Sequence, residues 1–506
     1  MMSEAAQTKV ISTWLSQTCF AGDLFSDSRD IAQSGKDAVF FAYQDGSTDG
    51  RNYIPHAIEN GAKAVIYEAA GFDWKEEWNV PHLSVKGLRE LAGPVADAYY
   101  NHPSSSMFVV AVTGTNGKTS CTQWIGSALS RFGKKTAVIG TLGIVIFEQG
   151  EAGIPEITGY TTPDQIQLQR RLAMLRQSGV SCIAIEASSI GIEEGRLNGL
   201  SIDVVLYTNF TRDHLDYHRD MASYEAAKRK LFDWPGLKCA VMNLDDAKGR
   251  EWASSLDGKL ELLGYTIKGE NAENMPVLSA TEIQSYMNKT AFLVESPYGK
   301  SRVRTQLVGK FNVSNVLGVL GVLLMQGIEW KAAVSVLSEL QPPPGRMQSL
   351  GGQDAPLIVI DYAHTPDALE KGLEALRMVA DDRKGELWCV FGCGGDRDKG
   401  KRKDMGCSAE MADHIIVTSD NPRSEEPLKI IRDILSGMTK PVLTIEDRAS
   451  AILQAVKHAS ANDVIFLAGK GHETYQEVMG IKQPFVDADH AALALATFKA
   501  MQKGIL

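Results

Sequence analysis

The sequence predicts an α/β protein of three domains, and three observations support this fold class. Apolar runs of strand length alternate with helical segments along most of the chain, as is typical of mostly parallel sheets. The length of 506 residues corresponds to about three domains. Segments rich in Pro or Ser interrupt the pattern at residues 102–106 and 341–346. We therefore expect domains at residues 1–105, 106–340 and 341–506.

The first two expected domains differ in size. The first is small, with apolar runs at Ala38–Tyr43 and Ala64–Tyr67. In the second, Thr162 before Pro163 predicts a helix start, with Thr as the N-cap and Pro as the first helical residue. The longest apolar stretch, Val316–Ile328, is too short to cross a bilayer and predicts a buried helix. Strand-like runs of the second domain lie at Thr136–Gly140, Cys182–Ile185, Val204–Tyr207 and Ala240–Met242.

The third expected domain repeats the alternation and ends most of its strands with polar residues. The clusters DYAHTPD, GCGGDRDKGKR, SDNPRSEEP and AGKGHETY each follow an apolar run. Ligands of open parallel sheets bind beyond the carboxyl ends of the strands, so these clusters predict a binding site. The runs lie at Leu357–Ile360, Leu387–Phe391, Ile415–Thr418, Val442–Ile445 and Val464–Leu467.

The segment Ala111–Ser120, AVTGTNGKTS, is the most informative part of the chain. It lies between a strand-like run and a helical stretch, so its backbone N–H groups and a helix N-terminus are expected to face one phosphate. Lys118 supplies a positive charge for the phosphate, and Thr119 supplies a hydroxyl for Mg²⁺. Val112 stands where the strict Walker pattern has Gly, so the loop is a variant. The segment predicts ATP binding by Gly114, Thr115, Asn116, Gly117, Lys118, Thr119 and Ser120.

The composition excludes several other classes of protein. A net charge of −10 disfavours a nucleic-acid-binding protein, which would normally present a basic face. The seven cysteines are odd in number and lack paired spacing, which argues against a disulfide framework and for a reducing compartment. The N-terminal residues lack the layout of a signal peptide. We expect a cytoplasmic location, no membrane insertion and a monomer.

The second domain contains three further candidates for metal binding or catalysis. Glu186 ends a buried run and is a candidate Mg²⁺ ligand together with Thr119. His214 and His218 have a spacing that can bind Zn²⁺, but no third ligand follows at a recognisable spacing, so we do not expect zinc. The spacing around Lys228 by itself favours a solvated helix lysine.

The third domain combines both signs of charge at its strand ends. Glycines precede the charged run that contains Arg397, Lys399, Lys401 and Arg402, which favours anion recognition over a solvated loop. Arg423 could hold a carboxylate through two hydrogen bonds, and Glu473 an ammonium group. Such a site suits an amino acid.

These motifs together resemble the Mur ligases. GTNGKTS, EASS, TNFTRDHLDYH, YEAAK, GKFNVSN, PPPGRM, DYAHTPDALEKGL, FGCGGDRDKGKR, DNPRSEEP and AGKGHE stand in the family's order. The resemblance implies a uridine-binding N-terminal domain, a central P-loop-type ATPase domain and a Rossmann-like C-terminal domain that binds an amino acid. It also implies an ATP-dependent ligase of peptidoglycan synthesis that joins meso-diaminopimelate to UDP-MurNAc-L-Ala-D-Glu through an acyl phosphate.

The resemblance assigns roles to individual residues. Two Mg²⁺ ions are implied, one at Thr119 and Glu186 and one near His214 and Lys228, with Lys228 carrying a carbamate derived from CO₂. The implied catalytic residues are Lys118, Glu186, His214 and Lys228. Further contacts are implied to ATP (Asn312, Asn315, Arg346, His364), to the UDP substrate (Ser28, Ser47, Thr161, Thr162, Ser188, Arg196) and to diaminopimelate (Arg397, Asp420, Asn421, Pro422, Arg423, Gly469, Glu473).

Three alternatives remain open at this point. A lysine-adding Mur ligase would lack the Arg at position 423, and a folylpolyglutamate synthase would lack both DNPR and the uridine domain. A nucleotide-dependent switch protein would hydrolyse ATP without either co-substrate. One departure from the family also stands out: Ile190 occupies a position where many members have His.

Overall fold

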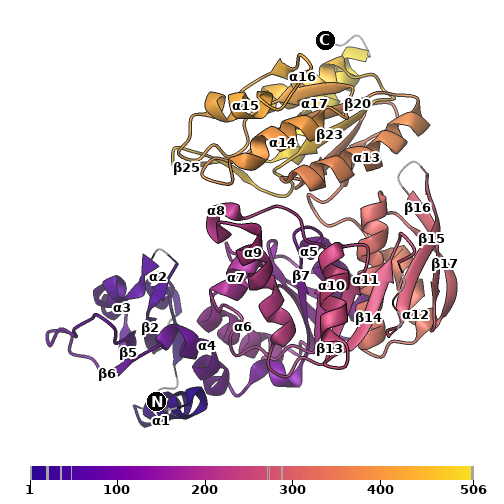
Figure 1. Cartoon of the computed structure of the whole chain (residues 1–506). Helices are drawn as coiled ribbons and strands as arrows, with labels where there is room; N and C mark the ends of the chain where they lie inside the picture. Colours follow the sequence, from indigo (N-terminus) through magenta and orange to yellow (C-terminus); the bar gives the residue numbers. More distant parts are fainter. Residues whose placement is uncertain are drawn as a thin grey trace.

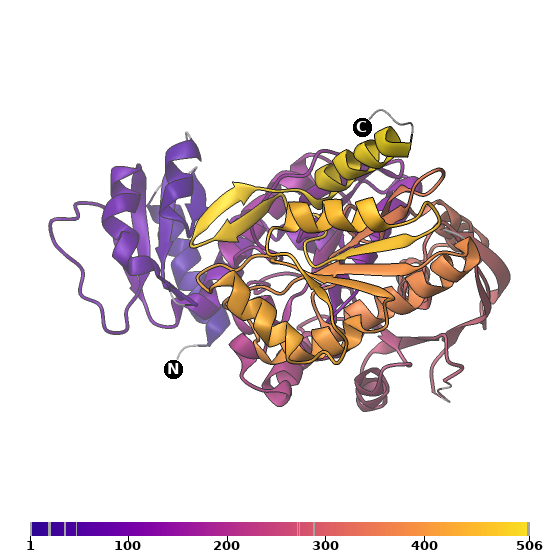
Figure 2. The same ribbon diagram turned by 90° about the horizontal axis from the view of Figure 1, so that it is seen from above.

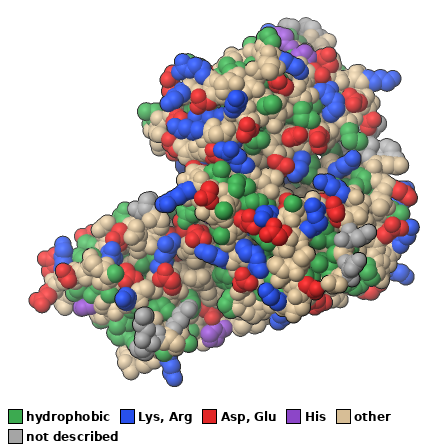
Figure 3. Space-filling model, in the orientation of Figure 1, with side chains coloured by type: hydrophobic (Ala, Val, Ile, Leu, Met, Phe, Trp, Pro, Cys, Tyr) green, Lys and Arg blue, Asp and Glu red, His purple; other side chains and the backbone are tan. Residues whose placement is uncertain are grey.

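The protein was analysed as a computed structural model that describes residues 3–18, 22–34, 37–46, 48–270, 272, 274–286 and 289–502. The chain forms three α/β domains, as predicted, and the third lies above the second, with the first to one side (Figures 1 and 2). The space-filling view shows the first domain projecting from the other two, with side chains of both charge signs scattered over this face (Figure 3). In the described part of the chain, no helix is both long and apolar enough to cross a membrane.

The first domain is built on a parallel sheet in the order β1-β2-β5-β6. The apolar run of β2 is buried along its whole length, which explains its strong sequence signal. A short hairpin, β3 and β4, follows β2. The bounds are β1 Asp23–Phe25, β2 Ala38–Ala42, β3 Gln44–Asp45, β4 Thr48–Asp49, β5 Ala62–Glu68, β6 His82–Val85, α1 Glu4–Gln17, α2 Ser28–Ser34, α3 Ile54–Glu59 and α4 Leu88–Tyr99.

The second domain carries an eleven-stranded sheet in the order β10-β9-β8-β11-β7-β12-β13-β14-β15-β16-β17. Its centre, from β8 to β15, is parallel and carries buried apolar clusters on both faces. Both edges are antiparallel additions. The strands are β7 Phe108–Thr113, β8 Thr136–Gly140, β9 Gly143–Glu148, β10 Glu151–Ala152, β11 Cys182–Glu186, β12 Val204–Tyr207, β13 Cys239–Asn243, β14 Glu261–Thr266, β15 Val277–Tyr286, β16 Lys289–Ser296 and β17 Gly299–Thr305.

The helices of the second domain confirm one sequence prediction and correct another. Helix α11 is buried, as its apolar sequence predicts. The helix expected to begin after Thr162 instead begins at Gln165, because the Asp164 side chain caps it and the Thr162 hydroxyl donates to the carbonyl of Glu186. The helices are α5 Lys118–Arg131, α6 Gln165–Gln177, α7 Ser189–Glu193, α8 Leu215–His218, α9 Met221–Arg229, α10 Ala247–Leu256, α11 Lys310–Met325 and α12 Trp330–Val336.

The third domain has a six-stranded sheet in the order β18-β19-β23-β20-β21-β22, parallel except at β18. The hairpin of β24 and β25 follows β23. The bounds are β18 Gln348–Gly351, β19 Leu357–Asp361, β20 Leu387–Phe391, β21 His414–Val417, β22 Leu443–Thr444, β23 Val464–Ala468, β24 Tyr475–Val478, β25 Ile481–Pro484, α13 Pro366–Arg383, α14 Gly400–Ala409, α15 Pro427–Leu435, α16 Arg448–His458 and α17 Asp487–Gln502.

Candidate active site

Two cavities meet at the phosphate loop, where the second and third domains face each other. The first, of about 490 Å³, is lined by both domains and includes Lys118, Glu186 and Arg423. The second, of about 730 Å³, lies on the other side of the loop and includes Asn315. Arg346 borders both cavities. Both cavities therefore adjoin the phosphate loop.

The phosphate loop joins β7 to α5 and depends on glycine at two positions. Gly114 and Gly117 both have positive φ, and a Cβ at Gly117 would lie 2.6 Å from Oδ1 of Asn315. The Lys118 ammonium donates to the carbonyl oxygens of Gly114 and Thr115, each at 2.9 Å. Burial lowers the pKa of Lys118. The loop therefore holds the Lys118 ammonium at the N-terminus of α5, where an anion such as phosphate can bind.

Glu186 and Thr119 lie together, as their predicted shared role requires. The Thr119 hydroxyl donates to Oε2 of Glu186 at 3.1 Å, and Arg346 donates to the same hydroxyl at 2.9 Å. The backbone N–H and the hydroxyl of Thr141 also donate to the Glu186 carboxylate. Glu186 is buried. A carboxylate and a hydroxyl beside a phosphate loop fit Mg²⁺ ligation, with phosphate oxygens and water completing the shell.

Lys228 is a buried residue of α9, contrary to the expectation from its spacing alone. It is 1% exposed, and its ammonium donates to the carbonyl of Gly114 at 2.9 Å and lies 4.8 Å from the ring centre of Tyr224. Burial, aided by the charge of Lys118, lowers its pKa well below the usual value. A buried lysine without a bonded carboxylate is predisposed to lose its proton or to be modified.

His214 is held by a carboxylate that the sequence analysis missed. Its Nε2 lies 3.4 Å from Oδ2 of Asp213, and burial lowers the pKa of His214 to about 3 despite that carboxylate. The imidazole is thus neutral, the form that ligates metals. His218 instead shares a 2.9 Å hydrogen bond with Ser189. In the described residues, no group of three or more His, Cys, Asp or Glu side chains is arranged to hold a metal.

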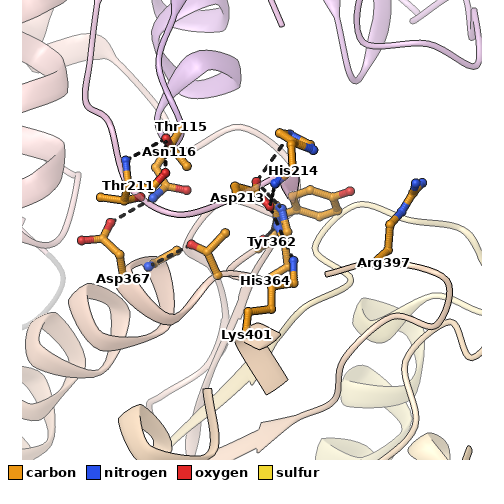
Figure 4. A network of polar contacts seen from close by, with 12 residues as sticks. Thr115, Asn116, Thr211, Asp213, His214, Tyr362, His364, Asp367, Arg397 and Lys401 are labelled. Carbon is orange, nitrogen blue, oxygen red and sulfur yellow. Dashed lines mark hydrogen bonds and ion pairs between the residues drawn. The ribbon is translucent and has the colours of Figure 1, made fainter. Parts of the chain in front are cut away.

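Asp213 also reaches the third domain. Its carboxylate lies 3.5 Å from Nε2 of His364 and 3.6 Å from the Lys401 ammonium (Figure 4). Burial would raise the pKa of Asp213, but the His364 hydrogen bond and the surrounding charges hold it well below the usual value. A second bond across the same junction joins the Asn116 amide to Asp367 at 2.9 Å (Figure 4).

The predicted amino-acid residues gather at the strand ends of the third domain. The Glu473 carboxylate accepts hydrogen bonds from the Asn421 amide at 2.7 Å and from the buried Lys470 ammonium at 3.1 Å. Lys470 therefore balances part of the negative charge of Glu473. Arg423 donates one N–H to the carbonyl of Gly395 and approaches Glu477 only at 3.9 Å. Donors of its guanidinium therefore remain for a ligand. The cavity is bordered by all the predicted diaminopimelate residues except Pro422: Arg397, Asp420, Asn421, Arg423, Gly469 and Glu473.

The cations of the charged run after β20 differ in their partners. The fully buried Arg402 makes two hydrogen bonds to Glu425 and a third to Asp433, and Lys399 pairs with Glu425. Lys401 faces Asp213. Arg397, which borders the first cavity, lies 3.7 Å from Asp216. Carboxylates of the same domain thus pair with Arg402 and Lys399, and anion recognition by the run stays a prediction that concerns Arg397 first.

The residues predicted to bind the UDP substrate fall into two places. Thr161, Thr162, Ser188 and Arg196 border the first cavity beside Glu186. Ser28 borders neither cavity; it is buried in the first domain, where its hydroxyl lies 2.9 Å from Nδ1 of His56. Ser47 lies outside the described residues.

Of the residues predicted to contact ATP outside the phosphate loop, some border a cavity and one does not. Asn315 borders the second cavity and His364 the first. Asn312 borders neither cavity, and its amide donates to the carbonyl of Val308. Ile190, at the position of the family's His, borders the first cavity and brings no ionisable group to it.

Three family models match the chain. Residues 26–100 match the model described as the Mur ligase family catalytic domain, residues 112–323 the Mur ligase middle domain, and residues 345–471 the Mur ligase glutamate ligase domain. Together they cover most of the chain.

Individual proteins give the same picture. The chain is 59% identical over 490 residues, 96% of each chain, to the UDP-N-acetylmuramoyl-L-alanyl-D-glutamate--2,6-diaminopimelate ligase of Janthinobacterium sp. (strain Marseille). It is 50% identical over 504 residues to the protein of that name from Ralstonia nicotianae, covering 97% of this chain and 96% of the relative. A solved structure with that name is 34% identical and superposes with a TM-score of 0.63, covering 94% of both chains.

Proposed function

The chain belongs to the Mur ligase family, and on that premise we propose that it is the ATP-dependent ligase that joins meso-diaminopimelate to UDP-MurNAc-L-Ala-D-Glu. One observation carries the proposal. A single cavity is bordered by the phosphate loop, by the buried Glu186 and by the mixed charges of the third domain, including Arg423 and Glu473. Phosphate chemistry and an amino acid therefore share one chamber, as a ligase requires.

The reaction needs an activated acid, because a carboxylate cannot expel oxide. Transfer of the γ-phosphoryl group of ATP to the D-Glu side-chain carboxylate forms an acyl phosphate and releases ADP. The amine of diaminopimelate then attacks the carbonyl carbon, phosphate leaves and the amine loses a proton. Lys118 and Arg346 stabilise the negative charge that gathers in the first step. Arg346 is suited to this role because its Nε has no partner and its guanidinium lies between both cavities.

Magnesium fits Thr119 and Glu186, and when bound it would supply charge neutralisation between the two reacting anions. The finer proposal concerns Lys228, whose lowered pKa favours the free amine. The amine nitrogen attacks CO₂, forms a C–N bond and loses a proton, which leaves a carbamate anion in place of a cation. With the neutral His214, such an anion would provide ligands for a second ion.

The choice of amino acid depends on Arg423. Diaminopimelate has one carboxylate more than lysine, at the far end of its side chain. Arg423 has guanidinium donors free for that carboxylate, whereas lysine would leave them unpaired. This contrast favours diaminopimelate over lysine as the substrate.

We further propose that residues 1–105 bind the uridine end, 106–340 bind ATP and 341–506 bind the amino acid. Ser28 would contact the uridine, and the wall formed by Thr161, Thr162, Ser188 and Arg196 would hold the sugar-peptide part. The proposed location is the cytoplasm, where ATP and UDP-linked precursors are available, and the proposed state is a monomer.

Phosphate release tests the function. We expect the purified protein to release phosphate from ATP only when UDP-MurNAc-L-Ala-D-Glu and diaminopimelate are both present, with lysine a far poorer substitute. ATP hydrolysis without either co-substrate would instead identify a nucleotide-dependent switch. Equal rates with lysine and diaminopimelate would overturn the assignment of the amino acid.

A further inference from the structure

We propose that Asp213 is a positioning residue that couples docking of the third domain to the orientation of His214. The inference rests on the proposed function, since it concerns a residue assigned to that reaction. Asp213 is 4% exposed and lies between His214 of its own domain and two side chains of the other, His364 and Lys401 (Figure 4). One buried carboxylate thus contacts the candidate metal ligand and the domain that delivers the amino acid.

The backbone of His214 needs support. Its φ is +55°, the left-handed region that non-glycine residues rarely adopt, and it directly precedes the four-residue helix α8. Oδ1 of Asp213 accepts a hydrogen bond from the His214 N–H at 2.9 Å. The carbonyl of His214 also accepts from the N–H groups of Tyr217 and His218, so the backbone is held on both sides. The imidazole itself lies 3.4 Å from the other carboxylate oxygen of Asp213, so the orientation of that carboxylate bears on where the ring points.

The third domain fixes that carboxylate. Lys401, on α14, is itself buried and lies 3.6 Å from Oδ1, while His364 follows β19 and lies 3.5 Å from Oδ2. The ring of His364 is oriented in turn by a 2.8 Å contact between its Nδ1 and the carbonyl of Tyr362. If the domains separate, Asp213 loses both partners and gains water. His214 would then be set correctly only when the amino-acid domain is docked.

A neighbouring ion pair between the same two domains provides a control for contacts that only hold the domains together. Arg212, the residue before Asp213, pairs with Asp398 of the third domain at 3.1 Å; the Asp398 side chain is 9% exposed, but that of Arg212 is 44% exposed. A pair in which the cation remains in water contributes little because water screens it. The inference thus assigns the coupling to Asp213 and not to Arg212.

Substitutions that remove only the charge test the coupling. Asp213→Asn retains an oxygen for the His214 N–H but loses the charge that faces Lys401, and Lys401→Met removes the cation from the other side. We expect each to lower kcat about 5- to 150-fold, the range of typical coupling between sites. The double variant should be no worse than the poorer single variant, and Arg212→Gln should stay within about twofold of the parent. Additive losses, or an equal loss in Arg212→Gln, would overturn the proposal.

A distance measurement without substrates separates this inference from the proposed function. Spin labels on the exposed Cys407 of α14 and on Met174→Cys of α6, in a Cys19→Ser background, report the separation of the two domains. We expect Asp213→Asn and Lys401→Met to broaden or lengthen the distance distribution, with an unchanged midpoint of thermal unfolding. An unchanged distribution in both variants would refute the coupling, whatever reaction the protein catalyses.

Discussion

Replacing Lys228 with alanine is expected to lower kcat by about 10²–10³-fold or more, the cost of removing one charge-stabilising group from an active site. Lys228 is 1% exposed and its ammonium reaches the carbonyl of Gly114 in the phosphate loop. Its pKa is depressed by burial, so the free amine is accessible for carbamate formation. Loss of that carbamate would remove an anionic ligand beside His214.

Two observations distinguish the carbamate from a purely structural lysine. Acetate should restore part of the activity of Lys228→Ala, because a small carboxylate fits the space that the substitution opens. The parent protein in ¹³C-bicarbonate should show a carbamate resonance that is missing in the variant. Lys230→Ala is the matched control, since the side chain of Lys230 is 53% exposed and pairs with Glu193. Full activity of unrescued Lys228→Ala would contradict the proposal.

Replacing Arg423 with alanine is expected to raise the KM for diaminopimelate roughly 10- to 100-fold, as loss of a charge-assisted hydrogen bond of about 1.5–3 kcal/mol implies. The KM for the UDP substrate should change little, because the cavity residues proposed for it belong to the second domain and Arg423 to the third. Steady-state kinetics with each substrate varied in turn measure the two constants.

The specificity of that result can be checked on the same domain. Arg432 of α15 has a side chain that is 69% exposed and lies 3.6 Å from Glu426. Arg432→Ala should leave all three Michaelis constants unchanged. A rise of equal size in the constants for both substrates of Arg423→Ala would show general damage to the domain and contradict the assigned contact.

Much of the fold follows from local patterns in the sequence. The fully buried strands β8, β12 and β20 match the expected apolar runs residue for residue, because a strand covered on both faces is apolar throughout. The antiparallel edge, in which β15, β16 and β17 pair as consecutive hairpins, was not anticipated, since its strands alternate polar and apolar residues and form no continuous apolar run. The start of α6 was misplaced because Thr162 bonds to Glu186, which is distant in sequence.

Some residues of the candidate site could likewise be predicted from the sequence, and others could not. The phosphate loop is readable because its glycines and lysine are contiguous. Asp213 was missed, since its importance arises from His364 and Lys401, which join it only in three dimensions. The burial of Lys228 could not be predicted, because burial of a single lysine leaves no mark on helical spacing, and the carbamate that the resemblance implies stays a proposal. Ser28 borders neither cavity described above, so its assignment to uridine stays a prediction.

The central claim is that the D-Glu carboxylate is phosphorylated before the amide forms, and oxygen transfer tests it most directly. The substrate is prepared with ¹⁸O in that carboxylate and turned over with ATP and diaminopimelate. One labelled oxygen should appear in inorganic phosphate for each amide made, because the acyl phosphate breaks at its carbonyl carbon. Phosphate free of ¹⁸O would contradict the mechanism.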